Sequence, residues 1–131
     1  MMQKSVEIIR GRRIVPGRAA GEAVVSRTPL CFLSEFNPVT GKVVDPAHPL
    51  WQRILAEKIL VIPSTKGSSG NPMHLRVACL EGKAPLALIN TEVDPLSALA
   101  CVINQIPMMV ISERDLKLIP DGAWLEIDAD R

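Results

Sequence analysis

Short apolar runs alternate with segments of helical pattern in the second half of the sequence. The apolar runs occupy residues 58–63, 86–90 and 108–111, and two helical segments separate them. A short, continuous apolar run is typical of a strand that is covered on both faces. Because helical crossovers between neighbouring parallel strands are right-handed, the pattern predicts a parallel βαβαβ unit and an α/β fold class. A further strand is predicted at residues 123–127.

Both predicted helices start with a capping residue followed by proline. These pairs are Asn71-Pro72 and Asp94-Pro95, and Gly82 is expected to end the first helix. Apolar side chains recur at helical spacing, which predicts the faces on which the helices pack. The apolar positions are Met73, Leu75, Val77, Cys79 and Leu80 in the first helix and Leu96, Leu99, Ala100 and Ile103 in the second.

The first 56 residues consist mainly of predicted strands and loops. Residues 5–15 predict two short strands or one bent hairpin, residues 19–27 predict a further strand, and residues 37–41 predict a tight turn. The proline-rich stretch 37–49 is expected to be a structured loop, because so short a segment does not comfortably form its own core. We therefore predict a single domain over residues 1–131, with a β-rich N-terminal half and the parallel βαβαβ unit as its C-terminal half.

Composition and charge exclude several classes of function. The formal net charge is +1, from 15 Lys and Arg against 14 Asp and Glu, so no general field attracts nucleic acid or an anionic membrane. Only 3% of the residues are aromatic, which is too few for a base-stacking platform. No run approaches the roughly 20 apolar residues that span a bilayer. We therefore expect neither nucleic acid nor a membrane among the partners.

The cysteines and the N-terminal sequence bear on location and on metal binding. Cys31, Cys79 and Cys101 are odd in number, far apart and without a CxxC pair, which argues against a disulfide framework and a local metal site. They are predicted to be small buried hydrophobes. Residues 1–7 carry no apolar signal core. Together these features predict a cytoplasmic location and no metal ligands in this chain.

The strongest candidate for chemistry is the loop at residues 63–72. It contains Lys66, Gly67, Ser68 and Ser69 and joins the end of a predicted buried strand to the start of a helix. Ligands bind at such junctions in open α/β sheets, and a helix N-terminus offers unpaired amide donors and partial positive charge. The loop is therefore a candidate site for a carboxylate or phosphate. It is neither a P-loop nor a nucleophile elbow, and a loop that merely turns the chain and caps the helix is the alternative.

Four arginines in the β-rich half and two histidines are further candidates. The arginines would converge on an anion if that half packs over the loop, although the first two also suit solvated edge positions. These arginines are Arg12, Arg13, Arg18 and Arg27. His48 and His74 are expected in solvent or at the edge of the core, because no spacing in the sequence enforces a Ser-His-acid triad.

Five segments are informative in combination. They are residues 17–27, residues 37–45 with the turn Asn-Pro-Val-Thr-Gly, residues 58–69 with Lys-Gly-Ser-Ser, residues 82–85 and residues 92–95. In this order they resemble the small subunit, or swivel domain, of the aconitase X family of hydro-lyases, over most of the chain. The resemblance implies a swivelling β/β/α domain that closes over a separate large subunit, in a heterodimer or a larger assembly. It also implies that the large subunit holds an iron–sulfur cluster, so this chain has no cofactor of its own and is active only with that partner.

The resemblance also assigns roles to residues of the loop. In the family's Lys/Arg-Gly-Ser motif the serine is taken as the proton acceptor, which implies Ser68 as the catalytic residue here. Lys66, Gly67, Ser69 and Arg27 are the implied substrate-binding residues. A neutral serine is a poor base, so its alkoxide would need stabilisation by backbone amides, a helix N-terminus and a nearby cation.

Characterised members of this family dehydrate either 5-phosphomevalonate or cis-3-hydroxy-L-proline. No second strongly basic cluster for a phosphate is evident near the loop, so we expect conversion of cis-3-hydroxy-L-proline to Δ1-pyrroline-2-carboxylate. Dehydration of phosphomevalonate is the alternative, and a partner module that binds an anion without chemistry is a third hypothesis. Relatives often follow the serine with further hydroxyl residues, whereas this chain continues with Ser69-Gly70-Asn71-Pro72, which changes the expected shape of the pocket.

Overall fold

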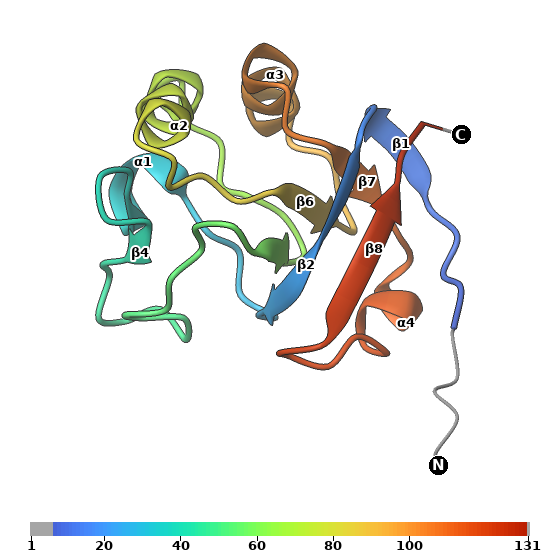
Figure 1. Ribbon diagram of the computed structural model, residues 1–131. Coiled ribbons are helices and arrows are strands. Elements are labelled where there is room, and N and C mark those ends of the chain that lie inside the picture. The colour runs from blue at the N-terminus through green and yellow to red at the C-terminus, as the bar shows by residue number, and fades with distance from the viewer. Residues whose placement is uncertain (1–6, 131) are drawn as a thin grey trace.

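A computed structural model describes residues 7–130, which form a curled sheet with helices on both sides (Figure 1). The strands are β1 (Arg12–Val15), β2 (Arg18–Val25), β3 (Phe36–Asn37), β4 (Lys42–Val43), β5 (Ile59–Val61), β6 (Ala87–Asn90), β7 (Met108–Val110) and β8 (Trp124–Asp128). The helices are α1 (Phe32–Glu35), α2 (Asn71–Leu80), α3 (Pro95–Asn104) and α4 (Glu113–Leu116). Within residues 7–130, no helix is long and apolar enough to cross a bilayer.

The main sheet confirms the predicted α/β architecture. Its six strands follow the order β1-β7-β6-β5-β2-β8, and β2, β5, β6 and β7 run parallel. Helix α2 connects β5 to β6, and α3 connects β6 to β7, which is the predicted βαβαβ unit. The edge strands β1 and β8 run antiparallel to their neighbours. The strand predicted at residues 123–127 therefore exists, but it joins the sheet beside β2 and not beside β7.

Both faces of the parallel strands are buried. On one face, Leu60 of β5 packs in a core with Leu75 of α2 and Ala100 of α3. On the other face, Ile59 packs with Leu116 of α4. Figure 1 shows α2 and α3 on one side of the sheet and α4 on the other. Because successive side chains of a strand point to opposite faces, a strand with both faces covered is apolar at every position.

The proline-rich stretch is a structured loop, as predicted. In the turn between β3 and β4, Asn37 Oδ1 accepts a hydrogen bond from Val39 N at 2.8 Å, and Gly41 has a φ of 75° that suits glycine. Farther along, Leu50 and Leu55 are buried in the same core as α2 and α3. The β-rich half therefore shares a core with the α/β half.

The buried faces of the two long helices match the predicted faces only in part, at Leu75 and Ala100. Met73 and Leu80 of α2 are 69% and 71% exposed, and Leu99 and Ile103 of α3 are 48% and 53% exposed. The buried positions are Asn71, Leu75 and Ala78 in α2 and Ser97, Ala100 and Cys101 in α3. Small side chains let the helices approach the sheet and each other closely, and this packing outweighs the apolar periodicity.

Several local predictions also differ from the structure. Helix α2 begins at Asn71 with Gly70 as its N-cap, so Asn71 is not the cap, whereas Asp94 does cap α3 by accepting a hydrogen bond from Ser97 N. Within residues 5–15, β1 alone forms where two strands or a hairpin were expected, and residues 5–6 lie outside the described part. Helix α4 was not predicted. Cys79 is only half-buried.

Candidate active site

The loop that precedes α2 places the Ser68 hydroxyl beside the start of that helix. Ser68 is half-buried, and its Oγ accepts a hydrogen bond from Gly70 N at 3.3 Å. The Ser68 carbonyl oxygen accepts a second bond from Asn71 N at 3.0 Å. The hydroxyl oxygen therefore contacts an amide donor at the positive end of a ten-residue helix. Such a position stabilises negative charge on that oxygen.

A buried asparagine attaches the loop to the β-rich half. Asn71 Nδ2 donates to the carbonyl oxygen of Lys66 at 3.0 Å, and Asn71 Oδ1 accepts from Leu33 N at 3.0 Å. Lys66 N also donates to the carbonyl oxygen of Leu30 at 2.9 Å. The residues after β2 therefore lie against the loop and fix its course. Sequence reasoning gave Asn71 only a capping role and missed this one, which depends on contacts with residues 38 positions away.

A buried carboxylate holds the side chain of Lys66. Lys66 Nζ lies 3.4 Å from Glu35 Oε1, and the same oxygen accepts a hydrogen bond from Cys31 N at 2.7 Å. Asp45 lies in the same cluster: a hydrogen bond from Ala47 N lowers the pKa of its carboxyl group, and Glu35 lowers that pKa further. Lys66 thus adds positive charge near the loop, but an acid that sequence reasoning missed partly neutralises it.

Gly67 and Ser69 lie on the exposed side of the same loop. A Cβ atom at Gly67 would lie 2.9 Å from Asp94 Oδ1, so only glycine lets the loop approach that carboxylate so closely. Asp94 Oδ2 in turn accepts hydrogen bonds from Ser97 N and Ser97 Oγ at the start of α3. The loop therefore lies at the N-terminal ends of both α2 and α3.

Arg27 lies in a separate pocket and not among the residues of the Ser68 loop. This pocket has a volume of about 140 Å³ and is lined by Arg27, Pro63, Thr91, Glu113, Leu116 and Lys117. Arg27 follows β2, whereas Lys117 follows α4 on the other side of the sheet from α2. The structure thus brings Lys66, Gly67, Ser68 and Ser69 together, and it places Arg27 at the same edge of the sheet with different neighbours.

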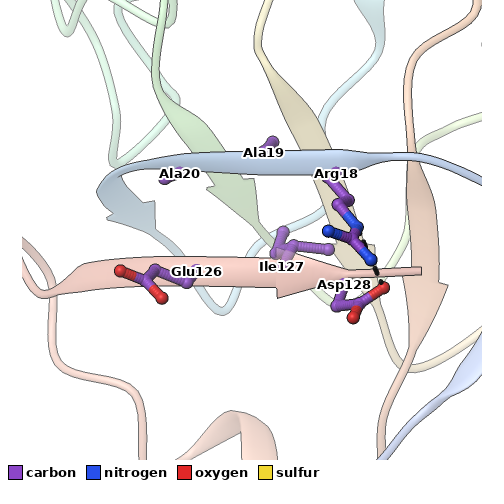
Figure 2. Close-up of a pocket in the computed structure, with 6 residues that line it drawn as sticks. All are labelled: Arg18, Ala19, Ala20, Glu126, Ile127 and Asp128. Atoms are coloured by element: carbon purple, nitrogen blue, oxygen red, sulfur yellow. Dashed lines mark ion pairs between the residues drawn. The ribbon is translucent and has the colours of Figure 1, made fainter. Parts of the chain in front are cut away.

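A larger but open hollow lies over β2 and β8 (Figure 2). It has a volume of about 510 Å³ and is lined by Arg18, Ala19, Ala20, Glu126, Ile127 and Asp128. Arg18 Nε lies 3.6 Å from Asp128 Oδ1 and 3.2 Å from Asp130 Oδ2. Arg18 pairs with these carboxylates at the start of β2, whereas Arg27 follows the end of that strand, so the structure does not bring the two arginines together on one anion. Arg13 likewise points to this end of the sheet, where its Nη1 donates to the Asp130 carbonyl oxygen at 3.3 Å.

Both histidines have structural partners, as expected for residues at the edge of the core. His48 Nδ1 accepts a hydrogen bond from Leu50 N at 3.0 Å, so its Nε2 is the donor to the Pro29 carbonyl oxygen at 2.9 Å. His74 Nε2 lies 2.8 Å from the carbonyl oxygen of Phe36. Both ring nitrogens of His48 are therefore engaged, and His74 is held to the backbone through Nε2.

No group of three or more His, Cys, Asp or Glu side chains within residues 7–130 is arranged to hold a metal ion.

Comparisons with known proteins converge on one family. Residues 8–131 match the family described as the aconitase X swivel domain. The small subunit of phosphomevalonate dehydratase from Methanothrix thermoacetophila is 35% identical over 123 residues, which cover 94% of this chain and 90% of that protein. The corresponding small subunit from Thermococcus kodakarensis is 37% identical over 122 residues, which cover 93% of this chain and 90% of that protein.

A solved structure shows the same fold. The crystal structure of aconitase X from Thermococcus kodakaraensis in its holo form superposes with a TM-score of 0.87 at 36% identity. The superposition covers 93% of this chain and 92% of the matched chain. The predicted swivel-domain fold is therefore confirmed.

Proposed function

This chain belongs to the aconitase X swivel-domain family and is a small subunit of an aconitase X type dehydratase, and from that premise we propose that it serves in the dehydration of 5-phosphomevalonate. The observation that carries the proposal is the similarity to several phosphomevalonate dehydratase small subunits over more than nine tenths of the chain. These relatives favour the alternative substrate over cis-3-hydroxy-L-proline, which was the first expectation from the sequence.

We propose that Ser68 is the proton acceptor of this reaction. Dehydration breaks a C–H bond, whose proton goes to the base, and a C–O bond, which releases hydroxide. Ser68 Oγ already accepts a hydrogen bond from Gly70 N at the start of α2, and this donor would stabilise the alkoxide form that acts as the base. Lys66 adds a positive potential, and its ammonium group lies 3.4 Å from Glu35 Oε1.

The resemblance to the family implies an iron–sulfur cluster, and we assign it to the large subunit. Within residues 7–130 no set of side chains fits such a group, because no three potential ligands converge there. When bound in the partner, the cluster supplies a Lewis acid for the leaving hydroxide. This chain contributes the Ser68 loop, which accepts the proton and orients the substrate.

The exposure of the loop is the reason to expect that the partner completes the site. Lys66, Gly67 and Ser69 are exposed and Ser68 is half-buried, so the loop is open to a second protein surface. A closed, water-poor site is what makes an amide dipole effective in stabilising charge. We therefore propose that this chain alone has no dehydratase activity and that closure over the large subunit creates it.

The test is co-expression of this chain with the large subunit encoded in the same genome, followed by assays with both candidate substrates. We expect turnover of 5-phosphomevalonate, no turnover by either chain alone, and a loss of about 10²–10⁴-fold or more in kcat for Ser68→Ala, which is the usual effect of removing a general base. Ser64→Ala removes a hydroxyl from the same loop and is the matched control, with kcat unchanged.

The possible results separate the hypotheses. Full activity of Ser68→Ala would show that another group takes the proton. Turnover of cis-3-hydroxy-L-proline in place of 5-phosphomevalonate would restore the original expectation about the substrate. Tight assembly with the large subunit but no reaction with either compound would favour a binding module without chemistry.

A further inference from the structure

We propose that the pocket between Arg27 and Lys117 binds the phosphate group of the substrate while Ser68 faces its reacting carbon. This inference rests on the proposed function and deepens it, because it assigns the end of the substrate that distinguishes a phosphorylated acid from cis-3-hydroxy-L-proline. The sequence by itself disfavours a phosphorylated substrate because no second basic cluster is evident near the loop. The second basic cluster exists, but its two members are 90 positions apart in the chain and meet only through the fold.

The pocket lies at the carboxyl ends of the parallel strands. Arg27 stands two residues after β2, Pro63 two residues after β5 and Thr91 one residue after β6. Ligands of open α/β sheets bind at this edge, where the loops diverge. Lys117, which follows α4, lines the pocket from the side of the sheet that α4 covers. The fold therefore directs two cations into the edge of the sheet that also carries the Ser68 loop.

Hydrogen bonds between two strand ends fix the wall of the pocket. Thr91 N and Thr91 Oγ1 donate to the carbonyl oxygen of Pro63 at 2.8 and 3.2 Å, and Glu92 N donates to the same oxygen at 3.1 Å. Pro63 is also the first residue of the loop that leads to Ser68. The pocket and the Ser68 loop therefore share Pro63, at the edge of the sheet where ligands of such folds bind.

The charges of the pocket suit an anion. In the part of the chain that the structure describes, neither Arg27 nor Lys117 forms an ion pair, whereas Arg18, Arg53 and Lys58 do. A guanidinium group binds phosphate oxygens through two parallel donors, and an ammonium group adds a compact charge. A phosphate monoester carries about −1.5 to −2 at neutral pH. Two cationic residues that line one pocket, without an ion pair among the described residues, therefore match this group.

Glu113 is the acidic member of the lining and acts against an anion. It stands four residues before Lys117 and reduces the formal charge of the pocket to +1. If the pocket binds phosphate, removal of this carboxylate must strengthen binding while removal of either cation weakens it. The two kinds of substitution are thus expected to change the phosphate affinity in opposite directions. A general effect on folding would not produce that pattern.

The size of the pocket indicates that it holds one end of a ligand. Its volume is about 140 Å³, whereas pockets that enclose a whole small molecule have roughly 300–1,000 Å³. Pro63 and Leu116 supply apolar walls beside the two cations. A phosphate with its first carbon fits such a space, and the rest of the substrate then extends along the edge of the sheet.

The experiment uses the assembled enzyme with four single variants. Arg27→Gln and Lys117→Gln each remove a cation of the pocket, and Glu113→Gln removes its acid. Arg114→Gln removes a cation of the same helix that does not line the pocket and is the matched control. The measurements are kcat and KM for 5-phosphomevalonate, the dissociation constant of inorganic phosphate by calorimetric titration, and the assembly of the complex by gel filtration.

We expect Arg27→Gln and Lys117→Gln each to raise KM and the phosphate dissociation constant by about 10- to 100-fold, which is the effect of losing a hydrogen bond to a charged group. The kcat value changes little, because neither residue handles the proton. Glu113→Gln lowers both constants, and Arg114→Gln leaves them unchanged. Phosphate binding that is equal in Lys117→Gln and Arg114→Gln would overturn the proposal, as would a loss of activity that comes only from failed assembly.

The outcome also separates this inference from the proposed function. If the wild-type complex does not turn over 5-phosphomevalonate, the proposed substrate is wrong, and the phosphate titrations still decide the pocket. If the wild-type complex turns over 5-phosphomevalonate but Arg27→Gln and Lys117→Gln keep the wild-type KM and phosphate affinity, only the assignment of the pocket fails.

Discussion

At the scale of single residues, the side chain of Asn71 connects the Ser68 loop to the β-rich half. Its amide group joins the Lys66 carbonyl oxygen to Leu33 N, with both hydrogen bonds at 3.0 Å. Asn71 is 0% exposed, so its amide group depends on these protein partners for its hydrogen bonds. One buried amide therefore connects the loop, the first turn of α2 and the β-rich half.

We expect Asn71→Ala to lower the free energy of unfolding by roughly 2–4 kcal/mol, because two part-buried partners lose their hydrogen bonds and each polar group left unpaired costs about 1–3 kcal/mol. Urea denaturation of the chain measures the change. Asn104→Ala is a useful control, since Asn104 Nδ2 also donates to two carbonyl oxygens, those of Pro72 and Ala100. Its Oδ1 is buried without a partner within residues 7–130, so truncation there also removes an unsatisfied atom and costs less. Equal losses for the two variants would contradict the role given to Asn71.

At the scale of elements, small side chains decide how α2 and α3 pack. Ala78 of α2 and Ala100 of α3 are 0% exposed, whereas Leu99, next to Ala100, is 48% exposed. A larger residue at the alanine positions would push the helices away from the sheet. Since the Ser68 loop enters α2 and Gly67 lies against the cap of α3, the distance between these helices also sets the shape of the site.

We expect Ala100→Leu to destabilise the chain by about 1–3 kcal/mol through overpacking. Leu99→Ala, which removes a larger and more hydrophobic side chain one position earlier, is expected to cost less than about 1 kcal/mol because the side chain is half exposed. Midpoints of urea denaturation provide both values. The reverse order of the two effects would mean that the helix faces are assigned wrongly.

At the scale of the whole molecule, one sheet joins both halves of the chain. Strand β2 from the β-rich half lies between β5 and β8, and the core on the side of α2 and α3 takes residues from Val15 to Met108. A change in the protonation of a group in this core is therefore expected to affect the free energy of unfolding of the whole chain. Cys101 of α3 is such a group, with 1% of its surface exposed.

Stability is expected to fall in alkaline solution because of this thiol. Burial, with a smaller contribution from Cys79, raises the pKa of Cys101 from 9.0 to about 12. Between these values the folded chain keeps a proton that the unfolded chain releases, so stability is complete below pH 9 and decreases as the pH rises toward 12. The decrease is at most about 1.4 kcal/mol per pH unit for one group.

The free energy of unfolding, measured in urea from about pH 8 to about pH 10.5, checks this expectation against the ordinary thiol pKa. Cys101→Ala should flatten the alkaline decrease. Cys79→Ala should flatten it less, since burial also raises the pKa of that thiol but the residue is only half-buried. An identical pH profile for wild type and Cys101→Ala would exclude Cys101 as the cause.

The sequence by itself was sufficient for the parallel βαβαβ unit and for the place of the candidate loop. The apolar run at β5, the cap at Asp94 and the position of Ser68 between a strand and a helix depend on interactions within a few residues, which a linear pattern contains. Tertiary structure alone decided which helix faces are buried, that Asn71 braces the loop and that Glu35 holds Lys66. It also decided that Arg27 and Lys117 share a pocket. These features depend on close packing between segments that lie tens of residues apart in the sequence. A local sequence pattern contains no information about which distant segments come into contact.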